Sequence, residues 1–279
     1  MKSFLHLLPA IGFLLFLQCT TTDNEPELNL VWADEFEISG MPNPDNWDYE
    51  QGFVRNNEHQ WYQPDNAWVE DGKLIIEGRR EQIENPNYNP DSDSWRSSRE
   101  FAEYTSTSMR TRGKQSWQYG RFEMRAKIDT REGLWPAFWM LGIDGQWPRN
   151  GEIDIMEYYD GDLLANAAWG TEEQWVANWD DSRYPVSNFE EGWADEYHIW
   201  RMDWTEEQIR IYVDDLLLNE IDLSETINPD GTNPFHQPHY MIVNLAIGGN
   251  NGGDPSGTEF PSRYEIDYIR VYEFVDAAI

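Results

Sequence analysis

Short runs of alternating apolar and polar residues constrain this chain more than any other feature of its sequence. Over residues 121–128, Phe122, Met124 and Ala126 share one face, and the charged residues between them share the other. Residues 208–213 repeat the pattern. A period of two indicates a half-buried β-strand, and Asp-Gly pairs that begin at positions 71, 144, 160 and 230 supply turns between such runs.

The alternation continues to the end of the chain, where Asp267, Ile269 and Val271 are expected to share a face opposite Ile266. Because strand patterns are many and no convincing long helix occurs, the sequence predicts an all-β fold of two packed antiparallel sheets. We expect residues 84–99, rich in Asn, Pro, Ser and Asp, to form a surface loop.

The N-terminal residues have the pattern of a targeting segment. Lys2 precedes a mainly apolar stretch that is too short for a confident membrane span. We expect residues 1–18 to be a signal peptide, residues 19–28 a short polar tether and residues 29–275 one folded domain. Cys19, the only cysteine, lies where a bacterial lipoprotein carries its lipid. The protein is therefore expected to be secreted, or held at the outer membrane or cell surface through Cys19 alone.

The charge of the chain excludes several classes of partner. Its 20 basic and 52 acidic residues give a formal net charge of −32. Nucleic acid and anionic membrane surfaces repel such a chain, so neither is an expected partner. We expect a soluble monomer whose partner is its substrate.

Three acidic residues stand close together in residues 151–157, and they carry the strongest signal for chemistry. Glu152 and Asp154 lie on one face of a regular strand, whereas Glu157, five residues from Glu152, lies on the other. One extra residue at Ile155–Met156 would form a β-bulge and return Glu157 to the face of the other two acids. The spacing therefore predicts a bulged strand with three carboxyl groups on one surface.

Carboxyl groups gathered in this way repel one another, so a function that requires them is the natural explanation. Retaining glycosidases need an ionised carboxylate as nucleophile and a protonated carboxyl as acid, ~5–5.5 Å apart. In so acidic a chain, an exposed acidic strand edge or a cation site would produce the same pattern. The three acids alone leave these alternatives open.

Tryptophans next to the acids favour a sugar-binding site. Trp135 and Trp139 precede the three acids on a compact apolar strand, and Trp147 lies just before them. Sugar rings present C–H faces that pack on indoles, although core packing uses the same residues.

These segments together resemble glycoside hydrolase family 16, and the E-x-D-x-x-E spacing resembles its laminarinase-like branch. The resemblance rests first on residues 133–141 and 151–157. Similar segments continue on both sides, so that it covers roughly residues 30 to 274: 56–61, 71–74, 109–112, 119–123, 203–205, 212–214, 244–249 and 267–272.

The resemblance implies a concanavalin-like β-jelly roll with an open substrate cleft on its concave sheet. Glu152 would be the nucleophile, Asp154 would orient it, and Glu157 would be the general acid and then the base. Residues 164–170 lack a histidine that laminarinase-like members often have there. The expected sugar contacts are Asn57, Arg112, Trp135, Trp139, Trp147, Asn166 and Trp169.

The family resemblance also implies a structural calcium ion, although catalysis needs no cofactor. The matching positions are Glu35 and Gly72, through backbone oxygens, and Asp267, through its carboxylate. Hard oxygen ligands of this kind suit Ca²⁺.

The function expected from the resemblance is a retaining endo-glycosidase that hydrolyses β-1,3-glucan, such as laminarin, or mixed-linkage β-1,3-1,4-glucan. Agarase, porphyranase, carrageenase and transglycosylase activities of the same family are alternatives. A non-catalytic lectin on the same sandwich would keep the tryptophans but would not need the three acids.

Overall fold

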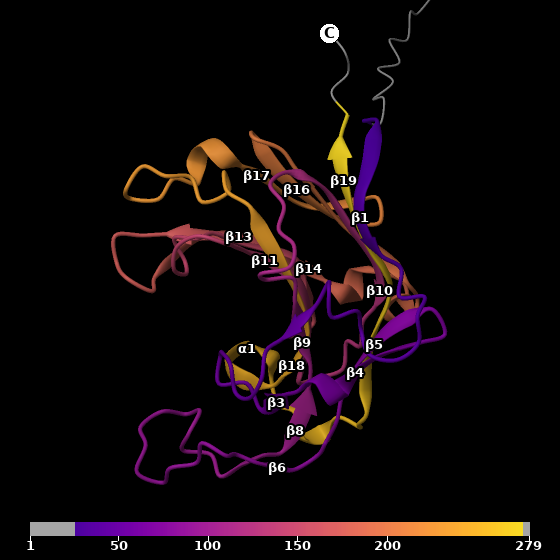
Figure 1. The fold of residues 1–279 in the computed structure, drawn as a ribbon, viewed down its shortest axis with the longest axis vertical. Helices are drawn as coiled ribbons and strands as arrows, with labels where there is room; N and C mark the ends of the chain where they lie inside the picture. The colour runs from indigo at the N-terminus through magenta and orange to yellow at the C-terminus, as the bar shows by residue number, and fades with distance from the viewer. Residues whose placement is uncertain (1–25, 276–279) are drawn as a thin grey trace, which may run out of the picture.

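The computed structural model describes residues 26–275, which form strands almost throughout (Figure 1). The signal peptide predicted for residues 1–18, the lipid attachment predicted at Cys19 and the tether up to residue 25 lie outside the described residues. The first strand begins at Leu28, one residue before the expected start of the domain. It pairs with the last strand, with Leu28 opposite Phe274, and Figure 1 shows the two side by side.

Two large sheets confirm the predicted fold, and every strand pair within them is antiparallel. The eight-stranded sheet has the order β17-β16-β15-β10-β19-β5-β4, and β1 also pairs with β19. Its strands are β1 (Leu28–Asp34), β4 (Ala67–Glu70), β5 (Lys73–Gly78), β10 (Gly120–Lys127), β15 (His198–Trp204), β16 (Gln208–Val213), β17 (Leu216–Asp222) and β19 (Ser262–Phe274).

The seven-stranded sheet has the order β14-β13-β12-β11-β18-β9-β2 and carries the candidate site. Its strands are β2 (Asp48–Tyr49), β9 (Ser108–Arg110), β11 (Leu134–Gly142), β12 (Glu152–Tyr159), β13 (Asp162–Gly170), β14 (Ala177–Pro185) and β18 (His239–Ile247).

Short elements join these sheets. Two small sheets pair β3 (Gln60–Tyr62) with β8 (Tyr104–Ser106), and β6 (Ile83–Glu84) with β7 (Phe101–Ala102). The remaining elements of the described residues are a short helix, α1 (Gly249–Gly252), and 3-10 turns at Pro64–Asn66, Val186–Asn188, Trp193–Asp195, Leu223–Glu225 and Pro255–Gly257. Within residues 26–275, no helix has the length and apolar character that crossing a membrane requires.

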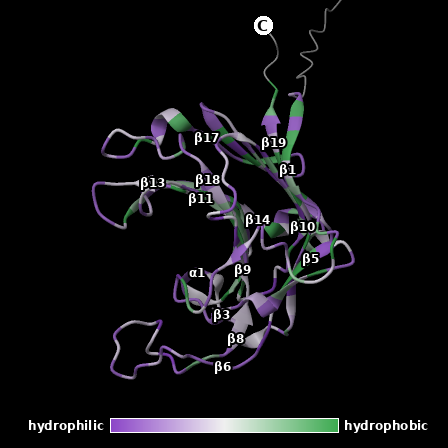
Figure 2. Cartoon of the chain, viewed as in Figure 1, coloured by the Kyte–Doolittle hydropathy of each residue, from purple (hydrophilic) through white to green (hydrophobic). Residues whose placement is uncertain are grey.

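The core lies between the two large sheets and follows the predicted alternation. Phe122, Met124 and Ala126 of β10 are fully buried and belong to one cluster with residues of the other sheet. The charged residues between them stay partly exposed. Figure 2 shows hydrophilic residues gathered in the projecting loops, whereas hydrophobic residues concentrate on the strands. Apolar burial between the layers is therefore the main stabilising term.

The predicted alternation of side chains along the last strand is wrong at Ile266. Ile266, Ile269 and Val271 are all buried in the core, although Ile266 was expected to face the other way. The register against β10 shifts between Arg125, opposite Tyr268, and Ala126, opposite Ile266. Asp267 is the extra residue of a β-bulge, which returns Ile266 to the core face.

The strand β11 is buried on both faces. Leu134, Phe138 and Met140 enter the core cluster, whereas Trp135 and Trp139, at the intervening positions, line a cleft on the outer face of the sheet. One face of β11 packs against the core and the other forms the floor of the cleft. This explains why the sequence of the strand is apolar throughout instead of alternating.

Truncating a side chain on the core face should test this assignment. We expect Phe138→Ala to lower the free energy of unfolding by ~3–5 kcal/mol, because Phe138 is fully buried and the cavity cannot collapse completely. Denaturant unfolding followed by fluorescence measures the change. Ile38→Ala is the control, since Ile38 is 85% exposed and its loss should change stability by no more than ~0.5 kcal/mol. Equal effects of the two substitutions would contradict the assignment.

Candidate active site

The predicted bulge is present in β12 at the predicted place. The four residues from Asp154 to Glu157 lie opposite only three residues of the partner strand β13, Asn166 to Leu164. The register against β11 shifts at the same point. Ile155 and Met156 both enter the core, so Glu157 returns to the face that carries Glu152 and Asp154.

All three acids line one cleft of about 860 Å³ on the outer face of the seven-stranded sheet. Its lining crosses the sheet from β14 through β13, β12 and β11 to β18, and loops close the far end. The residues besides the three acids are Arg55, Asn56, Glu58, Arg96, Trp135, Ala137, Trp139, Leu141, Trp147, Tyr159, Leu164, Asn166, Trp175, Trp179, Asp181, Arg183, Asn244 and Asn251. A long groove that runs across strands suits an extended polymer.

Indole and amide N–H groups hold the carboxyl groups in place. Trp147 Nε1 donates to Glu152 Oε2 at 2.9 Å, and Trp135 Nε1 donates to Glu157 Oε1 at 2.9 Å. Asn166 Nδ2 donates to Asp154 Oδ2 at 3.1 Å. Each acid thus has a neutral donor, which offsets part of the cost of burying it.

Burial also keeps protons on these carboxyl groups. It raises the pKa of Glu152 to about 8, with the nearby charge of Glu157 as the next cause. Burial raises the pKa of Glu157 to about 7 and the pKa of Asp154 well above its usual range. Asp154 and Glu157 also form a hydrogen bond that favours the proton on Asp154. At neutral pH the cluster therefore retains protons that exposed carboxyl groups would have lost.

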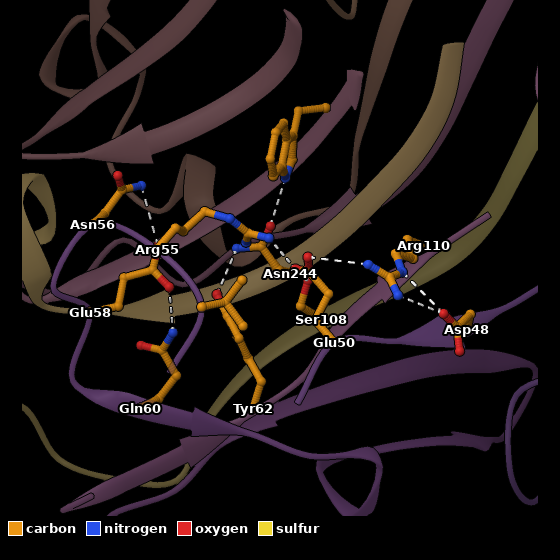
Figure 3. Close-up of polar contacts among 12 residues, drawn as sticks. Asp48, Glu50, Arg55, Asn56, Glu58, Gln60, Tyr62, Ser108, Arg110 and Asn244 are labelled. Atoms are coloured by element: carbon orange, nitrogen blue, oxygen red, sulfur yellow. Dashed lines mark hydrogen bonds and ion pairs between the residues drawn. The ribbon is translucent and has the colours of Figure 1, made fainter. Parts of the chain in front are cut away.

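A partly buried network of ion pairs and hydrogen bonds forms the wall beyond β11 (Figure 3). Arg55 forms an ion pair with Glu50, which also accepts from Ser108 Oγ at 2.7 Å. The guanidinium of Arg55 lies 5.0 Å from the ring centroid of Trp139. The charge of Arg55 favours the ionised form of Glu152.

Further polar side chains continue this network to the cleft floor. Glu58 is buried and accepts from Gln60 Nε2 at 2.7 Å. Asn244 Nδ2 donates to the hydroxyl of Tyr62 at 3.2 Å and its Oδ1 accepts from Trp139 Nε1 at 2.7 Å. Figure 3 shows the labelled members of the network on segments far apart in sequence.

Four of the predicted sugar contacts line the cleft: Trp135, Trp139, Trp147 and Asn166. The first two indoles are only 6% and 8% exposed, and all three use their N–H groups on neighbouring side chains. The guanidinium over Trp139 covers one face of that ring. These tryptophans therefore position polar groups, in addition to any contact with a sugar.

Three predicted contacts do not line the cleft. Trp169 packs against the core, since it lies three residues from Asn166 on a strand of regular register and so faces the opposite side. Asn57 donates to Asn250 Oδ1 at 2.9 Å, and its neighbour Asn56 lines the cleft instead. Arg112 lies beyond the end of β9, with its guanidinium 5.5 Å from the ring centroid of Tyr240.

Several cleft residues escaped the sequence analysis. Trp175 and Trp179 are 56% and 44% exposed. The alternation of side chains along β14 could have predicted that Trp179 faces the cleft. The loop expected only to cover the surface contributes Arg96, whose Nε donates to the carbonyl of Val54 at 3.2 Å. No local sequence pattern predicts Arg55 as a cleft residue, because contacts between segments distant in sequence bring it to the site.

The positions expected to bind calcium meet at β19. Register places Leu74 opposite Ile266 and Asp34 opposite Ile269, so the segments of Gly72 and Glu35 both adjoin Asp267. Its Oδ2 accepts from Arg125 Nη1 at 2.7 Å, and the side chain is 36% exposed. One carboxylate and two carbonyls with access to water fit Ca²⁺, although Arg125 competes for the carboxylate. Within residues 26–275, no cluster of three or more His, Cys, Asp or Glu side chains could hold a metal.

Comparisons with known proteins identify a family of similar sequences. The family model described as glycosyl hydrolases family 16 matches residues 92–270. A curated β-glucanase of Rhodothermus marinus is 37% identical, with 91% of this chain and 88% of that protein covered.

Two solved structures have similar folds. The laminarinase catalytic domain of Thermotoga maritima has a TM-score of 0.75 at 32% identity, over 90% of this chain and all of that one. A structure from work on endo-acting O-glycanases of human gut bacteria that initiate mucin breakdown has a TM-score of 0.81 at 33% identity, over 88% of this chain and 91% of that one.

Removing one indole donor should change the titration of its carboxyl group. The hydrogen bond from Trp147 lowers the pKa of Glu152, so we expect Trp147→Phe to raise that pKa further. Carboxyl ¹³C NMR titration of Glu152 measures the shift. Trp169→Phe is the control, because its ring faces the core and the titration of Glu152 should not change. A fall in this pKa for Trp147→Phe would contradict the assignment.

Proposed function

The chain belongs to glycosyl hydrolase family 16, and on this premise we propose that it is a retaining endo-glycosidase that cleaves β-1,3-glucan or mixed-linkage β-1,3-1,4-glucan. The bulge in β12 carries the proposal, because it brings Glu152, Asp154 and Glu157 to one open cleft. The β-glucanase and laminarinase names of the relatives support the substrate class.

In the first step, Glu157 donates its proton to the oxygen of the scissile bond, and a carboxylate oxygen of Glu152 attacks the anomeric carbon. The bond to the leaving sugar breaks, and an ester links the remaining sugar to Glu152. Trp147 fixes the attacking carboxylate, and Trp135 fixes the acid. Asp154 lies between them and shares a hydrogen bond with Glu157.

In the second step, the carboxylate of Glu157 takes a proton from water, and the water oxygen attacks the anomeric carbon. The ester to Glu152 breaks and the sugar leaves with its original anomeric configuration, since two inversions cancel. Glu157 ends the cycle protonated. Because the lining of the cleft crosses five neighbouring strands, a polymer can bind across it and be cut internally.

The pKa values of the protein alone place the higher value on Glu152, about 8, and the lower on Glu157, about 7. The proposed roles require the opposite order. Positive charge that develops on the anomeric carbon beside Glu152 favours its anion. The charge of Arg55 acts in the same direction. Substrate is therefore expected to direct the proton to Glu157.

The proposal predicts which polymer is cut and how. We expect purified enzyme to release reducing ends from laminarin or mixed-linkage β-glucan, and proton NMR of the first product to show the β-anomer. The panel also contains agarose, porphyran, carrageenan and mucin O-glycans. Release from one of these and not from a glucan would replace the substrate class, and an α-anomer as first product would contradict the mechanism.

Azide separates the roles of the two acids on an aryl β-glycoside with a good leaving group. Glu152→Ala with azide should give the α-glycosyl azide, because azide replaces the nucleophile. Glu157→Ala with azide should give the β-azide, because azide intercepts the ester on Glu152. Without azide, we expect Glu157→Gln to lower kcat/KM on the polymer by ~10²–10⁴-fold. A β-azide from Glu152→Ala and an α-azide from Glu157→Ala would instead make Glu157 the nucleophile and Glu152 the acid.

We also propose that Asp267, with the backbone oxygens of Glu35 and Gly72, holds a structural calcium ion. The ion would stabilise the junction of β1, β5 and β19, far from the three acids in the other sheet. It would have no part in the reaction.

Calcium should then raise the melting temperature of the protein, since a ligand at 100 times its Kd stabilises the folded state by ~2.7 kcal/mol. Scanning calorimetry with EDTA and with added Ca²⁺ measures the difference. We expect Asp267→Asn to abolish it. Arg125→Gln should keep it, because this substitution removes the competing cation and leaves the carboxylate. Equal melting temperatures with EDTA and Ca²⁺ for the unmodified protein would refute the site.

A further inference from the structure

The edge strand β14 presents a row of side chains to the cleft. Trp179, Asp181 and Arg183 are spaced two residues apart, and all three line the cleft. Trp175, in the loop before the strand, joins them. Both tryptophans and the neighbouring Val176 are large exposed hydrophobic residues. Apolar groups gathered in this way on a surface indicate a binding site.

The opposite face of β14 is held by β17 and the core. Ser182 Oγ donates to the carbonyl of Leu218 at 2.6 Å. Asp180 Oδ1 accepts from Asn219 Nδ2 at 3.0 Å, and Tyr184 packs against the core cluster. The row on the cleft face therefore stands on a fixed strand, which lowers the entropy cost of binding to it.

Strand register places this row relative to the three acids. Glu152 pairs with Ala168, which pairs with Trp179. Two strand spacings separate β12 from β14, or roughly 10 Å, which is longer than one sugar ring. A sugar bound on this row therefore lies beyond the ring that Glu152 attacks.

The exposed tryptophans differ from those near the acids. The indole N–H groups of Trp135, Trp139 and Trp147 are engaged by neighbouring side chains. Trp175 and Trp179 instead have about half of their surface open to solvent, and their indoles offer apolar faces to a ligand. A pyranose ring with its C–H groups on one face has the shape and polarity to cover such a surface.

We propose that Trp179 and Trp175 form a remote sugar subsite that stacks a pyranose ring of the substrate beyond the one that is attacked. This inference rests on the proposed function and adds where a longer glycan is recognised. Asp181, in the same row, accepts hydrogen bonds from hydroxyl groups of that sugar. The enzyme then distinguishes long chains from short ones through β14.

The test compares Trp179→Ala, Trp175→Ala and their double variant on oligosaccharides of increasing length, prepared from the polymer that the unmodified enzyme cuts. We expect kcat/KM on the longest substrates to fall about tenfold for each substitution, mainly through KM. The loss should grow with chain length and be smallest on the shortest substrate. Cleavage in H₂¹⁸O should show the position of the cut shifting along the oligosaccharide.

Trp68→Ala is the matched control, because Trp68 lies on β4 of the other sheet. This substitution should leave the dependence of kcat/KM on oligosaccharide length unchanged. Equal loss on short and long substrates, or full activity of the double variant on long ones, would overturn the subsite alone. An unmodified enzyme that cuts no glycan would overturn the proposed function, and the subsite with it.

Discussion

One extra residue in β12 determines what this molecule can do. In an unbroken pleat, Glu157 would enter the core and two of the three acids would remain on the cleft face. The bulge instead gives both Ile155 and Met156 to the core and returns Glu157 to the cleft. Apolar burial of these two side chains fixes the bulge, so the packing of the core and the geometry of the carboxyl groups are one constraint.

Gathering three carboxyl groups in a buried cleft is costly, and the surrounding residues reduce the cost in two ways. Indole and amide donors solvate the carboxyl groups, and protons retained at neutral pH remove part of the repulsion. The network around Arg55 adds a partly buried positive charge whose position is fixed by Glu50. Each of the three acids has a hydrogen-bond donor, which stabilises the cluster. Their raised pKa values leave protons available for transfer near neutral pH.

Local pattern predicted much of this architecture. The alternation of apolar and polar residues predicted the two packed sheets. The odd spacing between Glu152 and Glu157 predicted the bulge at Ile155–Met156. A bulge in β19 escaped because its extra residue, Asp267, follows an apolar residue in an otherwise regular run. The inward direction of Trp169 followed from parity and should have been found. Arg55 could not be predicted, because contacts between segments distant in sequence bring it to the cleft, and no local pattern reports such contacts.

The strand order of the seven-stranded sheet has an evolutionary consequence. The acids lie on β12, two strands inside the edge, whereas β14 has a partner on one side only. Mutations on an edge strand disturb fewer packed neighbours than mutations at the centre. Selection can therefore alter which polysaccharide is accepted by changing β14 and its loop while the reaction itself is preserved.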